Sequence, residues 1–216
     1  MREVRMSRIS KILRGAVVAA SLASLGGCAL VDVASEPAPR FFMLTPPALQ
    51  SKAPTMPVQL SVQEFTTSAA LETSRIVYQP SENEIKYYAG ARWADQTPAM
   101  IRQLMIETLE RSGGFAAVLG EGSPAQADYA LTGDIRRFAA MPAAGNEKRV
   151  EVELLARLIE KDTGRIVGTK LFSETVTSPD GRMDNVVGAY NAALGNVLSK
   201  LSGWTAATLK AAEPVG

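Results

Sequence analysis

The sequence predicts an α+β protein, with an antiparallel or mixed β-sheet and two main amphipathic helices packed on one of its faces in a single domain. Several stretches alternate apolar and polar residues, which indicates half-buried strands. Two other segments carry apolar residues at helical spacing, and they flank the central strands. The chain has 216 residues, enough for one domain with its own core even if a leader is removed.

The first half of the domain is expected to begin with a strand and a hairpin. Apolar and polar residues alternate over 58–62, which predicts a strand. Segments 75–78 and 85–88 are rich in β-branched and aromatic residues, and the turn-forming residues 80–83 lie between them. The segment 41–44 is too apolar for a linker, and we expect it to add an edge strand or to dock on the domain.

Helix signals appear at both ends of the predicted central strands. Thr97 is expected to cap the first helix, with Pro98 at its first helical position and the Ser-Gly-Gly of 112–114 at its end. Asp184 is expected to cap a final helix, in which Gly188, Ala192 and Gly195 allow close packing on the sheet. The apolar face of that helix comprises Val187, Tyr190, Leu194, Val197, Leu198 and Leu201.

A meander is predicted between the helices. After a short strand at 115–119 and a loop at 120–126, three strands are expected at 128–138, 150–156 and 166–176. The Asp-Thr-Gly at 162–164 matches a motif of aspartic proteases, whose chemistry needs two such carboxylates. Because the triplet occurs once and joins two alternating segments, we interpret it as a tight turn.

The N-terminus resembles the signal of a bacterial lipoprotein precursor. Residues 1–14 contain five Lys or Arg residues, and 15–25 carry no charge and are far shorter than a membrane-spanning helix. The run ends in the lipobox-like Leu25, Gly26, Gly27 and Cys28. This resemblance implies cleavage after Gly27, with diacylglycerol on the thiol and an acyl chain such as palmitate on the freed amine. An ordinary secretory signal ending near a buried cysteine is the alternative.

These features divide the chain into a signal peptide (1–27), a lipidated and proline-rich tether (28–57), the α+β domain (58–205) and a tail (206–216). Ala29 stands where Asp would resemble an inner-membrane retention signal, so the anchor is expected in the outer membrane, facing the periplasm.

Composition excludes several functions. After residue 27 the chain keeps 18 of its 23 Lys and Arg and 21 of its 22 Asp and Glu, a net charge of −3, so no nucleic-acid partner is expected. The absence of histidine excludes Ser-His-Asp and Cys-His catalysis and makes a zinc site improbable. Cys28 is the sole cysteine, so no internal disulfide exists. We therefore expect no enzyme activity, no metal, and no cofactor other than the lipid on Cys28.

The order of motifs resembles the ABC-type transport auxiliary lipoproteins, the group that includes paraquat-inducible protein C. The resemblance covers residues 40–205 and rests on this series: the segment 41–44, the strand 58–65, the stretch 71–78, the pair Tyr87-Tyr88, the series 92–95, the segment 128–131, the strand 150–159 and Trp204. It implies a periplasm-facing accessory subunit of a transporter that moves lipid between membranes. The implied partners are an MCE-type (mammalian-cell-entry) protein, an inner-membrane permease and an ATPase.

This chain lacks a phosphate loop, so it cannot be the ATPase itself. A structural or assembly-assisting outer-membrane lipoprotein without a transporter is the alternative, and a homo-oligomer is left open.

Candidate site residues are aromatic or basic. Arg92 and Trp93 are candidates for partner binding, because Arg and Trp are enriched at interface hot spots. The alternative is that Trp93 fills the space between hairpin and helix. Tyr78, Tyr87 and Tyr88 are candidates for a lipid groove, with ordinary cross-strand pairing as the alternative.

Overall fold

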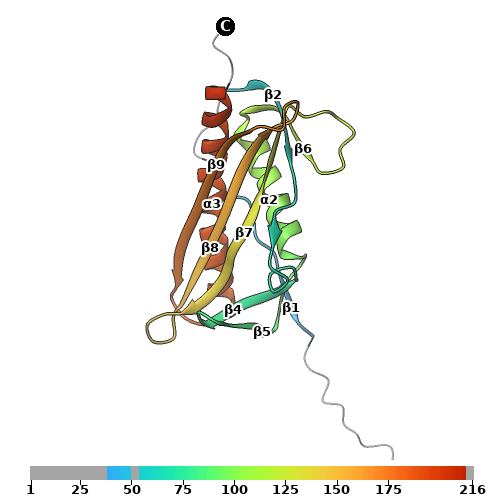
Figure 1. Cartoon of the computed structure of the whole chain (residues 1–216). Helices are drawn as coiled ribbons and strands as arrows, with labels where there is room; N and C mark the ends of the chain where they lie inside the picture. Colours follow the sequence, from blue (N-terminus) through green and yellow to red (C-terminus); the bar gives the residue numbers. More distant parts are fainter. Residues whose placement is uncertain (1–37, 50–53, 213–216) are drawn as a thin grey trace, which may run out of the picture. The chain divides into compact units, whose positions relative to one another are not determined.

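In the computed structural model, which describes residues 38–49 and 54–212, the sheet is centred on an antiparallel meander of three long strands (Figure 1). These are β7 (Tyr129–Pro142), β8 (Lys148–Glu160) and β9 (Ile166–Ser178). Strand β8 lies between β7 and β9, and its strict alternation gives it one buried face. Every second residue is fully buried: Val150, Val152, Leu154, Ala156 and Leu158. The predicted meander is confirmed, with each strand extended by a few residues.

The second edge of β7 pairs with three segments in succession, all parallel to it. These are β2 (Met56–Val62), β3 (Thr66–Thr67) and β4 (Arg75–Ser81), which pair with the beginning, middle and end of β7. Outside β2 lies β6 (Phe115–Gly120), again parallel. The sheet is therefore mixed, and with its nine strands and two helices in the described residues the α+β prediction is confirmed.

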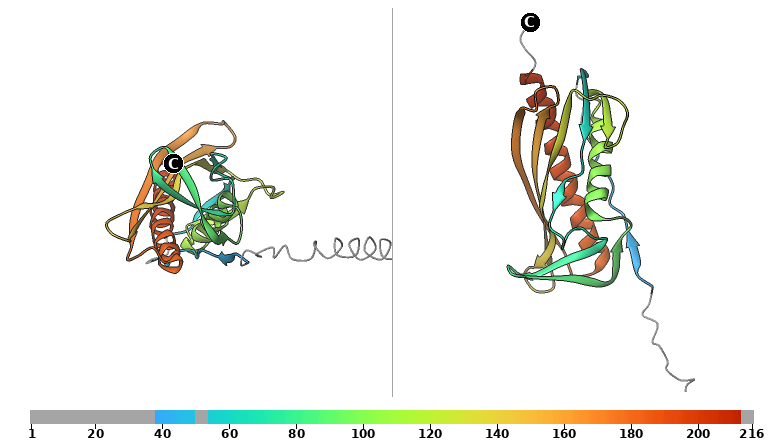
Figure 2. Two further views of the ribbon diagram at one scale, coloured as in Figure 1. Left: turned by 90° about the horizontal axis from the view of Figure 1, so that it is seen from below. Right: turned by 45° about the vertical axis from the view of Figure 1, so that its right-hand side comes forward.

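A hairpin of β4 and β5 (Glu84–Trp93) lies at the end of the sheet where β7 finishes, and β1 (Arg40–Phe42) adds to it as a parallel edge strand (Figures 1 and 2). The turn is narrower than predicted, since Ser81 pairs with Glu84 and Pro80 belongs to β4. Proline is tolerated there because the pairing of β4 with β7 lies at Tyr78, two residues earlier.

The two helices are α2 (Thr97–Ser112) and α3 (Met183–Ala212). Helix α3 packs along β8 and β9, helix α2 lies against β6 and β2, and the two helices contact each other (Figure 2). The predicted end of α2 is confirmed, because Gly113 adopts a left-handed conformation with φ of 67°.

Both predicted N-caps are wrong. Gln96 occupies the N-cap position of α2, and the Thr97 hydroxyl instead donates to the carbonyl of Thr73 at 3.0 Å. Asp184 lies within the first turn of α3, where its carboxylate pairs with Arg40 at 2.6 Å. In both places the side chain binds a group that is distant in sequence, and not the backbone amides of its own helix.

The small residues of α3 do not pack on the sheet as expected. Gly188 and Ala192 are exposed, whereas Tyr190 and Leu194 are buried. Two residues along a helix correspond to a rotation of about 200°, so the small pair lies opposite the apolar pair. Gly195 is buried, but a Cβ added there would meet Pro47 of the N-terminal segment, at 3.5 Å, and not the sheet.

The segment that precedes β2 is itself part of the packed domain. Leu44 is buried, and the backbone amide of Thr45 donates to the Oδ1 atom of Asn191 in α3 at 2.7 Å. The expectation that 41–44 adds an edge strand is confirmed by β1. Helix α3 continues to Ala212, beyond the predicted domain limit at 205.

Candidate functional site

The predicted lipidation site lies outside the described residues, as do Leu25, Gly26 and Gly27 of the lipobox. Cleavage after Gly27 and lipid attachment to Cys28 remain predictions from sequence. Among the residues that the structure describes, neither helix has the length and apolar character needed to cross a membrane.

The two partner-binding candidates point in opposite directions. Trp93 is 1% exposed, with its ring 5.2 Å from that of Tyr190 and 5.8 Å from that of Phe138. Arg92, the preceding residue, is exposed because neighbours on a strand face opposite sides of the sheet. Trp93 therefore belongs to the core where β5, β7 and α3 meet, and only Arg92 presents a surface.

The three tyrosines do not gather around one cavity. Tyr78 and Tyr88 pair, with ring centroids 5.5 Å apart, and burial raises the pKa of Tyr88 to about 12. Tyr87 instead donates its hydroxyl to the carbonyl of Ala70 at 3.2 Å, and its ring lies 3.6 Å beneath the Arg75 guanidinium. Each of the three tyrosine rings thus contacts another side chain of the same domain, and the three do not line a common groove.

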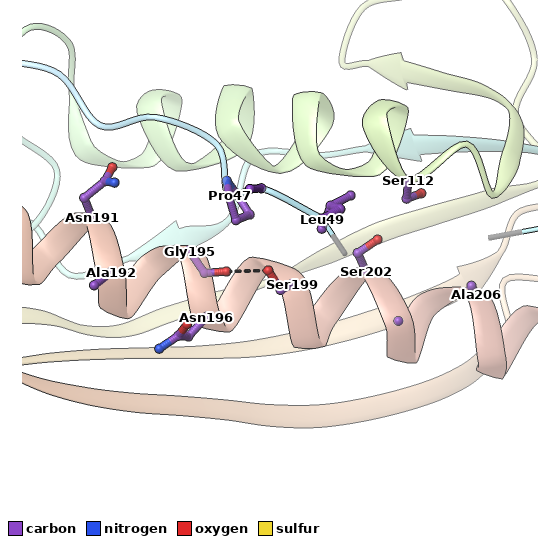
Figure 3. Close-up of a pocket in the computed structure, with 12 residues that line it drawn as sticks. Pro47, Leu49, Ser112, Asn191, Ala192, Gly195, Asn196, Ser199, Ser202 and Ala206 are labelled. Carbon is purple, nitrogen blue, oxygen red and sulfur yellow. Dashed lines mark hydrogen bonds between the residues drawn. The ribbon is translucent and has the colours of Figure 1, made fainter. Parts of the chain in front are cut away.

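A groove that the sequence did not predict lies between α3, α2 and the N-terminal segment (Figure 3). It has a volume of about 630 Å³, and its walls are the N-terminal segment 47–49 and Ser112 of α2. Its α3 side is made of small or amide side chains: Asn191, Ala192, Gly195, Asn196, Ser199, Ser202, Gly203 and Ala206. The only sequence signal for this groove was the recurrence of small residues along the helix, which had been assigned to the sheet side.

Ionisable groups in the described part of the domain form structural pairs. Asp134 of β7 accepts hydrogen bonds from the Thr66 hydroxyl at 2.6 Å and from Arg157 at 2.8 Å. These two partners, the Thr66 hydroxyl first, lower the pKa of Asp134. The pairs join β3, β7 and β8 across the sheet. Nowhere in the described ranges do three or more His, Cys, Asp or Glu side chains converge as metal ligands.

The Asp-Thr-Gly triplet is a turn, as interpreted from sequence. It connects β8 to β9, with Gly164 at φ of 70° and the Thr163 hydroxyl donating to Glu160 at 2.6 Å. All three residues of the triplet are exposed, as expected for a surface turn between two strands.

Residues 42–202 match the family model of the ABC-type transport auxiliary lipoprotein component. The chain belongs to this family. The family is one of auxiliary transport components and not of enzymes, and as a lipoprotein family it places the chain in the cell envelope.

The family match is supported by individual relatives. An uncharacterised protein of Bradyrhizobium diazoefficiens is 32% identical over 161 residues, which are 74% of this chain. The match spans 43% of that relative's length. The crystal structure of a Xanthomonas campestris protein superposes with a TM-score of 0.71 at 27% identity, covering 80% of this chain and 98% of the other.

A second crystal structure, of an uncharacterised protein, has a TM-score of 0.57 at 17% identity and covers 80% of this chain and 99% of the other. At that identity the likeness concerns the fold alone.

Proposed function

We propose that this auxiliary lipoprotein is the docking subunit of an MCE-associated ABC transport system that moves lipid between the inner and outer membranes. The observation that carries the proposal is the family match over 42–202, which spans almost the whole described domain. Asp134 and Arg157 bridge two strands of the sheet, so this ionisable pair has a structural role.

The membrane attachment in this proposal rests on Cys28. Each buried methylene of an attached acyl chain contributes about 0.8 kcal/mol, and stable anchoring needs at least two membrane-binding signals. Two or three chains on one cysteine meet that requirement. Ala29 favours the outer membrane, so the domain would face the periplasm and the inner-membrane components of the transporter.

Co-purification from native cells tests the docking role with a matched set of full-length variants carrying a C-terminal tag. Cys28→Ala removes the anchor and leaves the domain intact. Gly133→Ala leaves the anchor and disrupts the sheet, because the added Cβ would overlap the carbonyl oxygen of Leu155. Gly203→Ala is the control, since nothing lies within 4 Å of its added Cβ.

The expected result is recovery of an MCE-type protein, a permease and an ATPase with wild type and Gly203→Ala, and their loss with Gly133→Ala. Retention by Cys28→Ala, after detergent extraction and crosslinking, would show that the folded domain makes the contact. An ABC permease recovered without any MCE-type protein would refute the MCE assignment. Recovery of no transporter component at all would favour the second candidate, a structural or assembly-assisting envelope lipoprotein.

A further inference from the structure

Two large apolar side chains are exposed where the chain enters the domain. Phe41 is 65% exposed and Met43 is 76% exposed, while Phe42 and Leu44 between and after them turn inward. Strand alternation explains this arrangement, because residues two apart lie on the same side. The outer side of this edge segment is therefore apolar. Burial of these two side chains within the domain would have lowered the free energy of the folded state, so their exposure is informative.

Arginines continue the same surface across the hairpin. Phe41 of β1 is the register partner of Arg92 in β5, and Arg92 is the partner of Arg75 in β4. Register partners share a face, so these three exposed side chains form one row. We call Phe41, Met43, Arg75 and Arg92 the entry face.

The charge of the entry face is not cancelled within the described part of the chain. Neither Arg75 nor Arg92 has a carboxylate within ion-pair distance among the described residues, and the Arg75 guanidinium stacks on the ring of Tyr87. The acidic Asp184 at this end is already paired with Arg40. An apolar edge beside unpaired cations is the chemistry of surfaces that rest on anionic lipid.

The length of chain between Cys28 and the entry face limits how far this surface can lie from an anchored lipid. Phe41 is 13 residues after Cys28. At 3.3–3.6 Å per residue, that chain reaches at most about 45 Å whatever its conformation. The described chain enters the domain through β1, so the entry face lies next to the end of the domain from which the tether departs (Figure 1).

We propose that the entry face rests against the lipid bilayer, with Phe41 and Met43 in the interface and Arg75 and Arg92 near anionic headgroups. This inference rests on the lipid anchor in the proposed function. It fixes the orientation of the domain: the hairpin of β4 and β5 faces the membrane, and the turn between β8 and β9 at the far end of the meander points away from it.

Site-specific labelling of the lipidated chain tests the orientation. Met43→Cys introduces a free thiol, because the thiol of Cys28 is consumed by its lipid. Leu171→Cys is the matched control, as it replaces an apolar residue that is 44% exposed on β9. Each variant carries an environment-sensitive fluorophore in phosphatidylglycerol–phosphatidylethanolamine vesicles with a quencher on the acyl chains.

The expected result is quenching and a shift to shorter wavelength at position 43, with neither at position 171. Adding Arg92→Glu should reduce the quenching at position 43, whereas the charge-matched Lys161→Glu, in the distant turn between β8 and β9, should not. Equal signals at 43 and 171 in chains that float with the vesicles would overturn the inference and leave the anchor intact.

A label at 43 that is shielded only after transporter components are added would also overturn the inference, in favour of a protein contact. Chains that fail to float with the vesicles would overturn the anchor itself, and this inference with it.

Discussion

At the scale of single residues, Tyr190 illustrates how the core is held together. Its ring makes an edge-to-face contact with Trp93 and a tilted contact with Phe138, and its buried hydroxyl donates to the carbonyl of Val77 at 2.7 Å. Burial raises the pKa of this tyrosine well above its usual value, so it is neutral at physiological pH. One side chain of α3 thereby joins β4, β5 and β7.

Tyr190→Phe tests the contribution of that hydroxyl. The ring and its contacts with Trp93 and Phe138 are retained, but the hydrogen bond is lost and the Val77 carbonyl remains buried. We expect the free energy of unfolding to fall by about 1–2 kcal/mol, which urea titration can measure. Tyr78→Phe is the control, since its hydroxyl forms no hydrogen bond within the described residues. Equal losses in both variants would contradict this account.

At the scale of secondary structure elements, the ladder between β7 and β8 depends on a close approach at Gly133. A Cβ at this position would overlap the Leu155 carbonyl oxygen and come within 2.8 Å of the Phe65 ring. The carbonyl belongs to the opposing strand and cannot move without breaking the pairing of β7 with β8.

Gly133→Ala is therefore expected to destabilise the domain by several kcal/mol, of the size seen for overpacked sites or more. Gly203→Ala should have the opposite sign, with a gain of up to about 1 kcal/mol, because alanine is the better residue in an open helical position. Thermal unfolding of the two variants measures both changes in stability, the expected loss for Gly133→Ala and the expected gain for Gly203→Ala. A Gly133→Ala protein as stable as wild type would contradict the close approach.

At the scale of the whole molecule, the segment 38–49 ties the hairpin end of the sheet to α3. It pairs with β5 through β1, buries Leu44, and binds α3 through Arg40 and Thr45. The pair of Arg40 and Asp184 is exposed, so it contributes little in water. The hydrogen bond from Thr45 to Asn191 is the more defined polar contact.

Asn191→Ala is expected to lower the free energy of unfolding by about 1 kcal/mol and to speed hydrogen exchange at Thr45 in particular. Asn196→Ala, on the same helix and lining the same groove, should leave exchange at Thr45 unchanged and should not lower the free energy of unfolding, because its amide forms no hydrogen bond within the described residues. Native-state hydrogen exchange compares the two. If both variants exchanged alike, the segment would be held by Leu44 and β1 alone.

Local patterns in the sequence determined the meander, the C-terminal end of α2, the edge strand at 41–44 and the turn at 162–164. Alternation and turn chemistry act over a few residues and can be read without a partner. The same patterns carry the family resemblance, which the match over 42–202 confirms.

Only the tertiary structure decided whether each candidate side chain lies in the core or on the surface, and which residues it contacts. The parallel pairing of β2, β3 and β4 with β7 joins segments 60–70 residues apart, which no local pattern reveals. Trp93 entered the core and Arg92 the surface because β5 presents one side to α3. Gly188 and Ala192 are exposed and do not face the sheet, because Tyr190 and Leu194 supply far more apolar surface and took the buried side of the helix.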